Sequence, residues 1–347
     1  MTSDIALWLV QDGIVNGAIY ALVALALLLV FAVTRVIFVP QGEFISYAAL
    51  SMAMLQLGQV PATIWILVGG GLVAAILEAV TAWRQGAVRR LPSILARYIA
   101  IPIAIAAVVG WSASRALPSW VQALLVLALI MPLGPILYRI AYQPLANASV
   151  IVLFIVSMAV HYMLTGLGLV FFGAEGLRAD PFIDAGFQLG ILDISAQSLI
   201  VIAVSILMMI CLWLFFERSL YGKALRATAI NRTGARLVGI RIELSGNLSF
   251  LLAAFIGAVS GVLISPITTI YYDSGLMIGL KGFIGAIFGG MVSYPLTALG
   301  AVGLGLLESF SSFWASALKE SIVFTIIIPI LIWRSLTSHQ HIEDEEE

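Results

Sequence analysis

Residues Glu217–Leu263 read ERSLYGKALRATAINRTGARLVGIRIELSGNLSFLLAAFIGAVSGVL. The first part is a polar segment that follows a long apolar run, and the second part opens another apolar run. Six of the 17 Lys and Arg residues of the chain lie in the polar part: Arg218, Lys223, Arg226, Arg232, Arg236 and Arg241. Basic loops between apolar spans lie on the cytoplasmic side of a membrane. The stretch therefore predicts two membrane-spanning helices joined by a cytoplasmic loop.

The composition of the whole chain is also that of a membrane protein. Of its 347 residues, 62% are hydrophobic and only 10% are charged, whereas about 25% of the residues of a soluble domain are charged. The net charge of −1 gives no electrostatic reason to expect nucleic-acid binding. The one cysteine, Cys211, lies inside an apolar run, where we expect a small packing residue rather than a metal ligand.

Apolar runs long enough to span a membrane recur along the chain. The N-terminus lacks the basic residues of a cleaved signal peptide, so we expect the first run, 13–34, to be retained. The run 43–77 is interrupted near Gly58 and Pro61, which predicts two helices there. We expect the remaining helices near 98–114, 116–138, 150–172, 198–216, 247–272, 279–293, 296–313 and 321–333.

These runs predict an all-α integral membrane protein. It is a polytopic bundle of about 10 or 11 transmembrane helices in one domain, 1–347, and some helices are broken or short at Pro and Gly. Placing the basic loop, 217–247, in the cytoplasm also puts 84–97 and Arg139 there, and puts the acidic loop 175–193 and the N-terminus outside. The acidic tail, 335–347, is predicted to be a disordered cytoplasmic end.

A set of short motifs, in this order, resembles permease subunits of the branched-chain amino acid ABC importer family. They are Asn16-Gly17 with Tyr20-Ala21-Leu22, Gln41-Gly42-Glu43-Phe44 (with Gln where the family has His), Ala141–Leu145 (with Gln for Arg), Gly222–Ile240, Leu280–Phe283, Gly289-Gly290 and Leu307-Glu308. The resemblance covers roughly residues 10–60 and 138–333. The chain is longer than the family pattern between Phe44 and Ala141, which predicts an extra helical hairpin within 84–147.

The resemblance implies a permease that passes a branched-chain amino acid inward by alternating access, in the inner (plasma) membrane of a bacterial-type cell. In this family two permeases pair, two cytoplasmic ATPases bind beneath them, and an extracytoplasmic binding protein delivers the solute. The chain has no GxxxxGK[ST] phosphate loop, so we expect the ATPase to be a separate protein. We expect no cofactor on this chain, since ATP would be bound by the partner, and no covalent chemistry.

The first candidate group lies in or beside the apolar runs, where polar side chains are costly unless they face a cavity or a partner. Glu43 either caps a broken helix or lines the translocation route, or it is a solvated residue at the cytoplasmic end. Glu308 forms a structural salt bridge or borders the route, and Lys281 could pair with Asp273 or Glu308. The route and helix-break candidates are Asn16, Gly17, Tyr20, Gln41, Gly42, Glu43, Lys281 and Glu308.

Two other intramembrane residues have plainer interpretations. We expect His161 to be a packing histidine rather than a metal ligand or proton relay, because no second histidine lies near it in the sequence. Glu78 lies near the end of its helix and is expected to be an interfacial acid.

The second candidate group lies in the polar stretch 217–247, which we call the coupling segment. Its small residues would let an ATPase approach closely, its Arg side chains could pair with acids of that partner, and Gly239 would end a short helix. The alternative is a loop that binds anionic lipid headgroups. The coupling candidates are Gly222, Ala224, Arg226, Ala227, Ala235, Arg236 and Gly239.

Three other functions stay open. A secondary transporter driven by an ion gradient would carry intramembrane carboxylates placed symmetrically in two halves, and Glu43 and Glu308 are few and asymmetric. A membrane enzyme such as a transferase would cluster His, Asp or Cys at one face, a pattern that this sequence lacks. Within the resembled family, a urea or amide permease is an equally simple interpretation, because solute affinity resides largely in the binding protein.

Overall fold

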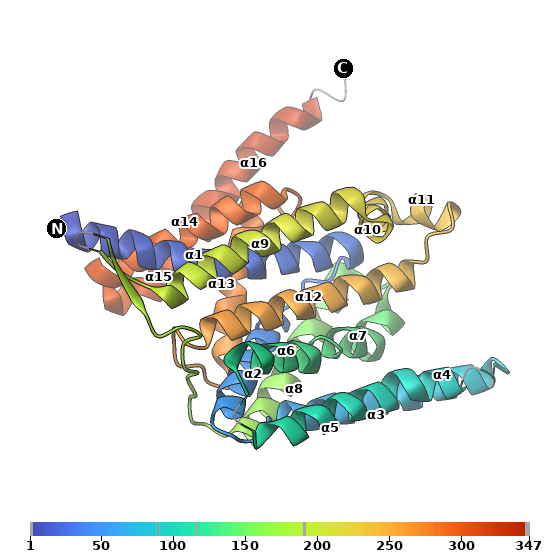
Figure 1. Cartoon of the computed structure of the whole chain (residues 1–347). Helices are drawn as coiled ribbons and strands as arrows, with labels where there is room; N and C mark the ends of the chain where they lie inside the picture. Colours follow the sequence, from blue (N-terminus) through green and yellow to red (C-terminus); the bar gives the residue numbers. More distant parts are fainter. Residues whose placement is uncertain (1–2, 88, 90, 116, 190–191, 344–347) are drawn as a thin grey trace. The chain divides into compact units, whose positions relative to one another are not determined.

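The computed structural model describes residues 3–87, 89, 91–115, 117–189 and 192–343. This part of the chain is almost entirely helical (Figure 1). Its two strands, β1 (Gly186–Leu189) and β2 (Leu192–Ser195), form one antiparallel hairpin. The predicted all-α membrane fold is confirmed.

Within these residues, nine helical stretches are long and apolar enough to cross a membrane, and α2 and α13 are shorter. This set agrees with the prediction of a bundle with some short helices. The helices are α1 (Ser3–Thr34), α2 (Gln41–Gln56), α3 (Thr63–Arg84), α4 (Leu91–Leu95), α5 (Ile101–Ala113), α6 (Ser119–Ile130), α7 (Leu133–Leu137), α8 (Val150–Phe172), α9 (Ala196–Arg218), α10 (Leu220–Ile230), α11 (Arg232–Leu237), α12 (Ile242–Ile264), α13 (Ser274–Phe288), α14 (Tyr294–Trp314), α15 (Lys319–Thr325) and α16 (Ile327–Glu343).

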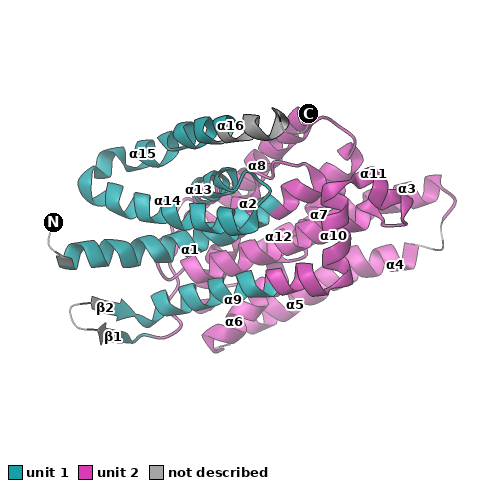
Figure 2. Cartoon of the chain, turned by 90° about the horizontal axis from the view of Figure 1, so that it is seen from above, with its two compact units in different colours: residues 1–28, 184–211, 277–347 teal, residues 29–183, 212–276 magenta. Residues whose placement is uncertain are grey.

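The chain divides into two compact units (Figure 2). Unit 1 contains Met1–Leu28, Asp184–Cys211 and Met277–Glu347, and unit 2 contains Leu29–Ile183 and Leu212–Leu276. Helices α1, α9 and α13 each begin in one unit and end in the other.

The predicted break between the second and third helices is present. Helix α2 ends at Gln56 and α3 begins at Thr63. Between them Gly58 has a φ of 72°, in the left-handed region that glycine enters without a Cβ clash. The adjacent Pro61 lacks a backbone N–H, so a continuous helix is disfavoured there.

The core of unit 2 is the packing of α2 against α12. A Cβ placed on Gly261 would collide with the carbonyl oxygen of Ile45, and a Cβ on Gly257 would lie 2.9 Å from the Cβ of Phe44. Glycines four residues apart lie on one face of a helix and let two backbones approach closely. Gly257 and Gly261 therefore allow α2 and α12 to pack closely.

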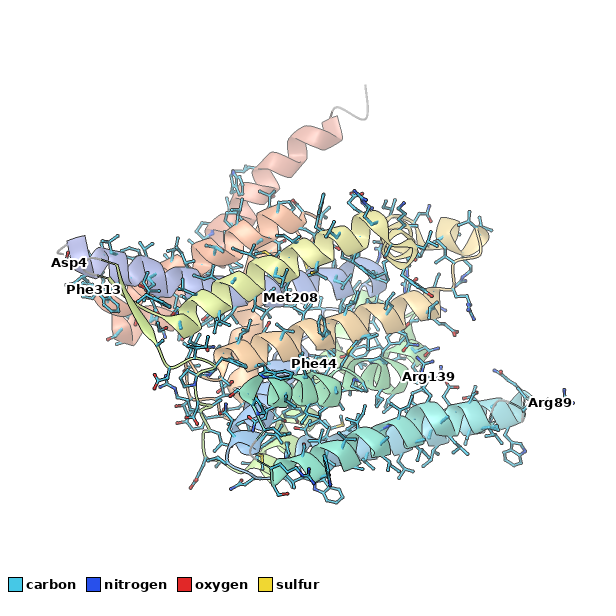
Figure 3. The ribbon with its side chains drawn as sticks, viewed as in Figure 1. Asp4, Phe44, Arg89, Arg139, Met208 and Phe313 are labelled. Atoms are coloured by element: carbon cyan, nitrogen blue, oxygen red, sulfur yellow. The ribbon has the colours of Figure 1, made fainter. Side chains whose placement is uncertain are left out.

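Basic residues of unit 2 gather at one end of it. Figure 3 shows Arg89 and Arg139 at the end of unit 2 where α4, α7 and α11 also lie in Figure 1. Arg139 forms a salt bridge of 2.9 Å with Glu78, so the predicted interfacial acid has a partner. This arrangement supports the prediction that 84–97, Arg139 and 217–247 face the same side of the membrane.

The end of the chain differs from the prediction of a disordered tail over 335–347. Helix α16 continues to Glu343, and residues 344–347 lie outside the described residues. The stretch from Leu331 to Glu343 contains neither Gly nor Pro, so no residue in it breaks the helix that precedes it.

The glycine packing between α2 and α12 predicts that two Gly→Leu variants differ widely in thermal stability. In Gly261→Leu the new side chain meets the backbone of α2, which cannot move aside as a flexible side chain would, and overpacking of this kind costs about 3 kcal/mol. Thermal unfolding in detergent is expected to show a lowered midpoint. Gly166→Leu in α8 is the matched control, because no atom lies within 4 Å of its Cβ position. Equal midpoints for the two variants would contradict the packing described.

Candidate translocation and coupling residues

Helix α2 begins inside unit 2 directly after Pro40. Gln41 is fully buried, and its Nε2 donates to the carbonyl oxygen of Ala253 on α12 at 3.0 Å. A Cβ on Gly42 would overlap the carbonyl oxygen of Gly275, at the start of α13. Gly42 is therefore required where the beginnings of two short helices meet.

Glu43, in the first turn of α2, forms a buried pair with a histidine. Its Oε1 lies 2.6 Å from Nδ1 of His161 on α8, and the two side chains are 1% and 4% exposed. The other oxygen, Oε2, has no hydrogen-bond partner. A negative charge is favoured at a helix N-terminus, but a carboxylate this deeply buried also needs a partner. Glu43 is thus not the solvated residue that our plainer interpretation placed at the cytoplasmic end.

The structure gives His161 more than the packing role that we predicted. It joins α8 to α2 through Glu43, and Oγ1 of Thr165 lies 3.4 Å from the same nitrogen. Glu43 and His161 are 118 residues apart, so no sequence spacing could reveal their contact. The only signal was the presence of two ionisable residues in apolar runs.

The other buried charges form a network inside unit 1. Nζ of Lys281 on α13 lies 2.7 Å from Oε1 of Glu308 on α14, so Glu308 is the partner of Lys281, and Asp273 is not. The hydroxyl of Tyr20 on α1 donates to Oε2 of Glu308 at 2.7 Å. Glu320 and Lys319 complete the network, at 3.1 Å from Lys281 and 3.3 Å from Glu308. Both oxygens of Glu308 are therefore satisfied.

The remaining candidates on α1 serve helix contacts. Asn16 donates to Asp12 on its own helix at 3.3 Å. A Cβ on Gly17 would lie 2.7 Å from the Cα of Val302, so Gly17 allows α1 and α14 to approach closely. The eight route and helix-break candidates thus fall into two groups, one in each unit.

The coupling segment folds as two short helices with well-formed ends. Ser219 caps α10 by accepting a hydrogen bond from the N–H of Gly222, and Asn231 caps α11 by accepting one from Gly234, both at 2.8 Å. Gly239 has a φ of 86° just after α11, as expected for the glycine that ends a helix.

Several coupling candidates have structural contacts of their own. A Cβ on Gly222 would collide with the carbonyl oxygen of Phe215, and Ala235 is buried. Arg226 forms a salt bridge of 3.1 Å with Glu217 of the same segment, and its pairing with a partner stays a prediction. Ala224 accepts a hydrogen bond from Thr228 at 2.8 Å through its backbone oxygen.

The coupling segment exposes several large apolar side chains, which the sequence analysis did not anticipate. Leu237 and Ile230 are each 84% exposed, and Val238 is 76% exposed. Ile230 precedes α11, Leu237 is its last residue and Val238 follows it. The same helix carries Arg232 and Arg236. An exposed apolar group with a polar rim is typical of an interaction surface.

Comparison with known proteins identifies the family. A family model described as "Branched-chain amino acid transport system / permease component" matches residues 95–332. The chain belongs to this family. The permease protein LivH of Escherichia coli K12, from a high-affinity branched-chain amino acid transport system, is 24% identical over 337 residues, which cover 92% of this chain and 91% of LivH. The family resemblance seen in the sequence is confirmed.

Permeases of other organisms are also similar to this chain. BraD of Pseudomonas aeruginosa, from a high-affinity branched-chain amino acid transport system, is 27% identical over 203 residues, covering 56% of this chain and 66% of BraD. A probable branched-chain amino acid transport permease of Methanocaldococcus jannaschii is 26% identical over 201 residues, covering 56% of this chain and 64% of that protein. The chain is therefore a multi-pass membrane protein of a transport family.

The Glu43–His161 pair predicts that Glu43→Gln lowers transport without preventing insertion. The amide disturbs the buried hydrogen bond between α2 and α8 at a cost of about 1.5 kcal/mol, which corresponds to roughly tenfold slower uptake if the pair is needed in the transporting state. Uptake is measured in cells that depend on this transport system. Glu78→Gln, which removes a carboxylate at the end of α3, is the matched control and should retain uptake. Unchanged uptake in Glu43→Gln would leave Glu43 with a structural role only.

The Lys281–Glu308 network predicts that substitutions at these two positions have non-additive effects on the free energy of unfolding. Glu308→Leu leaves the buried ammonium of Lys281 with only the half-exposed Glu320 and is expected to cost about 3 kcal/mol of unfolding free energy. The double variant Lys281→Met with Glu308→Leu should recover part of that loss. Unfolding of the four proteins in detergent gives the interaction energy. Additive effects would show that the two side chains do not interact in the folded protein.

Proposed function

We propose that the chain is the membrane-spanning subunit of an ATP-driven, binding-protein-dependent importer of branched-chain amino acids. Its full-length similarity to LivH, whose name describes high-affinity branched-chain amino acid transport, supports this solute. The complex would lie in the inner membrane of a bacterial-type cell. A second permease subunit, cytoplasmic ATPases and an extracytoplasmic binding protein would complete it. The chain itself would carry out no covalent chemistry, and ATP would be bound by the partner.

The observation that carries the proposal is the set of exposed apolar side chains in the coupling segment. Leu237, Val238 and Ile230 project from a basic end that, by the positive-inside rule, lies in the cytoplasm. The two short helices are fixed by their caps, so they offer a preformed shape to a cytoplasmic partner. A cytoplasmic ATPase that binds these side chains could transmit its conformational change to the membrane helices.

Contacts inside unit 2 offer a path for that movement. Thr228 on α10 and Ser245 on α12 have their hydroxyl oxygens 3.2 Å apart. Helix α12 in turn packs against α2 through Gly257 and Gly261, and α2 bonds to α8 through Glu43. A push on α10 would therefore reach α12, then α2 and α8, and change the access of the route from one side to the other.

The proposal is tested by co-purification with a tag on this chain. We expect the wild-type chain to recover an ATPase and a second permease subunit. Gly239→Trp places a bulky ring on the exposed side of α11, where no atom lies within 4 Å of the Cβ position. This variant should still recover the second permease. The amount of ATPase recovered should fall at least about tenfold, which corresponds to 1.4 kcal/mol of docking energy, and ATP-dependent uptake should be lost.

The matched control is Gly239→Ala. Because the φ of 86° strains alanine and tryptophan alike, this variant separates the backbone strain from the bulk of the ring, and it should retain the ATPase. Recovery of equal amounts of ATPase by the alanine and tryptophan variants would remove the coupling segment from the docking surface. Transport by purified chain with no ATPase present would overturn the proposed function itself and would favour the ion-driven alternative.

A further inference from the structure

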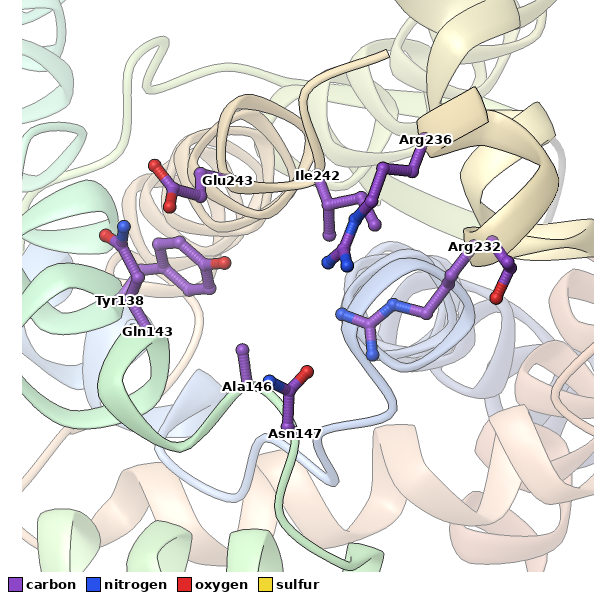
Figure 4. A pocket seen from close by; sticks show the side chains of 9 residues that line it. Tyr138, Gln143, Ala146, Asn147, Arg232, Arg236, Ile242 and Glu243 are labelled. Atoms are coloured by element: carbon purple, nitrogen blue, oxygen red, sulfur yellow. The ribbon is translucent and has the colours of Figure 1, made fainter. Parts of the chain in front are cut away.

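A polar cavity of about 390 Å³ lies in unit 2 beside α11, and the function proposed above does not use it (Figure 4). One wall is formed by the end of the α6–α7 span and the turn that follows it. A second wall is α11, and a third is the start of α12. The polar residues that line it are Tyr138, Gln143, Asn147, Arg232, Arg236 and Glu243.

Two guanidinium groups are directed into this cavity. Figure 4 shows the side chains of Arg232 and Arg236 extending from α11 toward the opposite wall. Nε of Arg232 is buried and has no hydrogen-bond partner. In the part of the chain that the structure describes, no salt bridge joins either arginine to a carboxylate. Glu243 lines the same cavity but pairs with neither.

The local charge balance is positive. Partial burial lowers the pKa of Arg232, and the nearby positive charges of Arg35 and Arg236 act in the same direction. Arginine nevertheless stays protonated in proteins. Like charges held close together are stabilised when an anion is placed between them. The cavity therefore lacks one negative group, and it has room for that group.

We propose that this cavity binds a phosphate group, supplied by the headgroup of an anionic phospholipid in the cytoplasmic leaflet. The planar fork of a guanidinium matches phosphate geometry, and the hydroxyl of Tyr138 and the amide of Asn147 offer further donors. The volume lies within the range of small-ligand sites. The cavity lies where the α6–α7 span ends and α12 begins, so with the coupling segment in the cytoplasm it would lie near the lipid headgroups of that leaflet. Basic pockets between helices on this side of a membrane suit such headgroups.

A bound headgroup would touch α11 and the ends of two membrane spans at once. It would therefore hold the coupling segment in a fixed position relative to the bundle of unit 2. This role needs neither ATP nor a transported solute, so it can be tested on the purified chain alone.

The test titrates the full-length chain, purified in detergent and stripped of lipid, with phosphatidylglycerol or with phosphatidylcholine of the same acyl chains. Native mass spectrometry counts the bound lipids. We expect phosphatidylglycerol to bind more tightly than phosphatidylcholine. Arg232→Gln and Arg236→Gln should each lower the affinity for phosphatidylglycerol by about fivefold. Arg241→Gln removes the same charge from the same loop outside the cavity and should leave binding unchanged.

A second arm titrates inorganic phosphate by calorimetry, so that the two sources of the group are distinguished. Binding of phosphate, but not of phosphatidylglycerol, with the same dependence on Arg232 and Arg236 would keep the anion site and overturn its lipid source. Equal phosphatidylglycerol binding by all four proteins, or an equal loss in Arg241→Gln, would overturn the proposal. Size-exclusion profiles check that each variant is folded. The result does not depend on an ATPase, so the proposed function can fail while this site stands.

Discussion

The close approach of α2 and α12 is the constraint on which the rest of unit 2 depends. Lipid offers no hydrophobic driving force between helices, so association in a membrane relies on tight packing and on satisfied polar groups. Gly257 and Gly261 provide the tight packing, because they bring the two backbones into direct contact. The hydrogen bond from Gln41 to the carbonyl oxygen of Ala253 satisfies a buried polar group. A short helix can therefore begin inside the protein without leaving its first turn unsupported.

The same constraint accounts for the buried position of Glu43, and a second buried carboxylate lies in unit 1. Once α2 begins inside the bundle, Glu43 lies in its first turn, far from solvent, and it needs a hydrogen-bond partner within reach. Nδ1 of His161 on α8 supplies one. In unit 1, Glu308 is satisfied from three helices, α1, α13 and α15, through Tyr20, Lys281 and Lys319. Each carboxylate thus ties together helices that lie far apart in the sequence.

The sequence predicts the features that arise locally, and it fails where distant segments meet. Apolar runs set the spans, Gly58 and Pro61 set the break between α2 and α3, and Gly239 sets the end of α11. Periodicity and turn chemistry act over a few residues, so they can be read directly. The pairing of Glu43 with His161 depends on how α2 and α8 pack, and nothing near either residue specifies it.

The coupling segment shows the same limit in another form. Its small and basic residues suggested a docking loop, but which side chains are free depends on packing that the sequence does not reveal. Arg226 is occupied by Glu217, whereas Leu237 and Val238, apolar residues that would ordinarily be expected to be buried, are exposed. Arg236 was singled out for a protein partner, and the structure shows that it also lines a cavity together with Arg232.

Unit 1 is built from segments that lie far apart in the sequence, and this has a consequence for biosynthesis. Tyr20 leaves the ribosome 288 residues before the glutamate that accepts its hydrogen bond. At about 10 residues per second, α1 waits in the bilayer for roughly half a minute before α14 is made. During that interval its tyrosine hydroxyl and its glycine face have no native neighbour. Helix α1 must therefore be sheltered, by the translocation machinery or by lipid, until α14 has been translated.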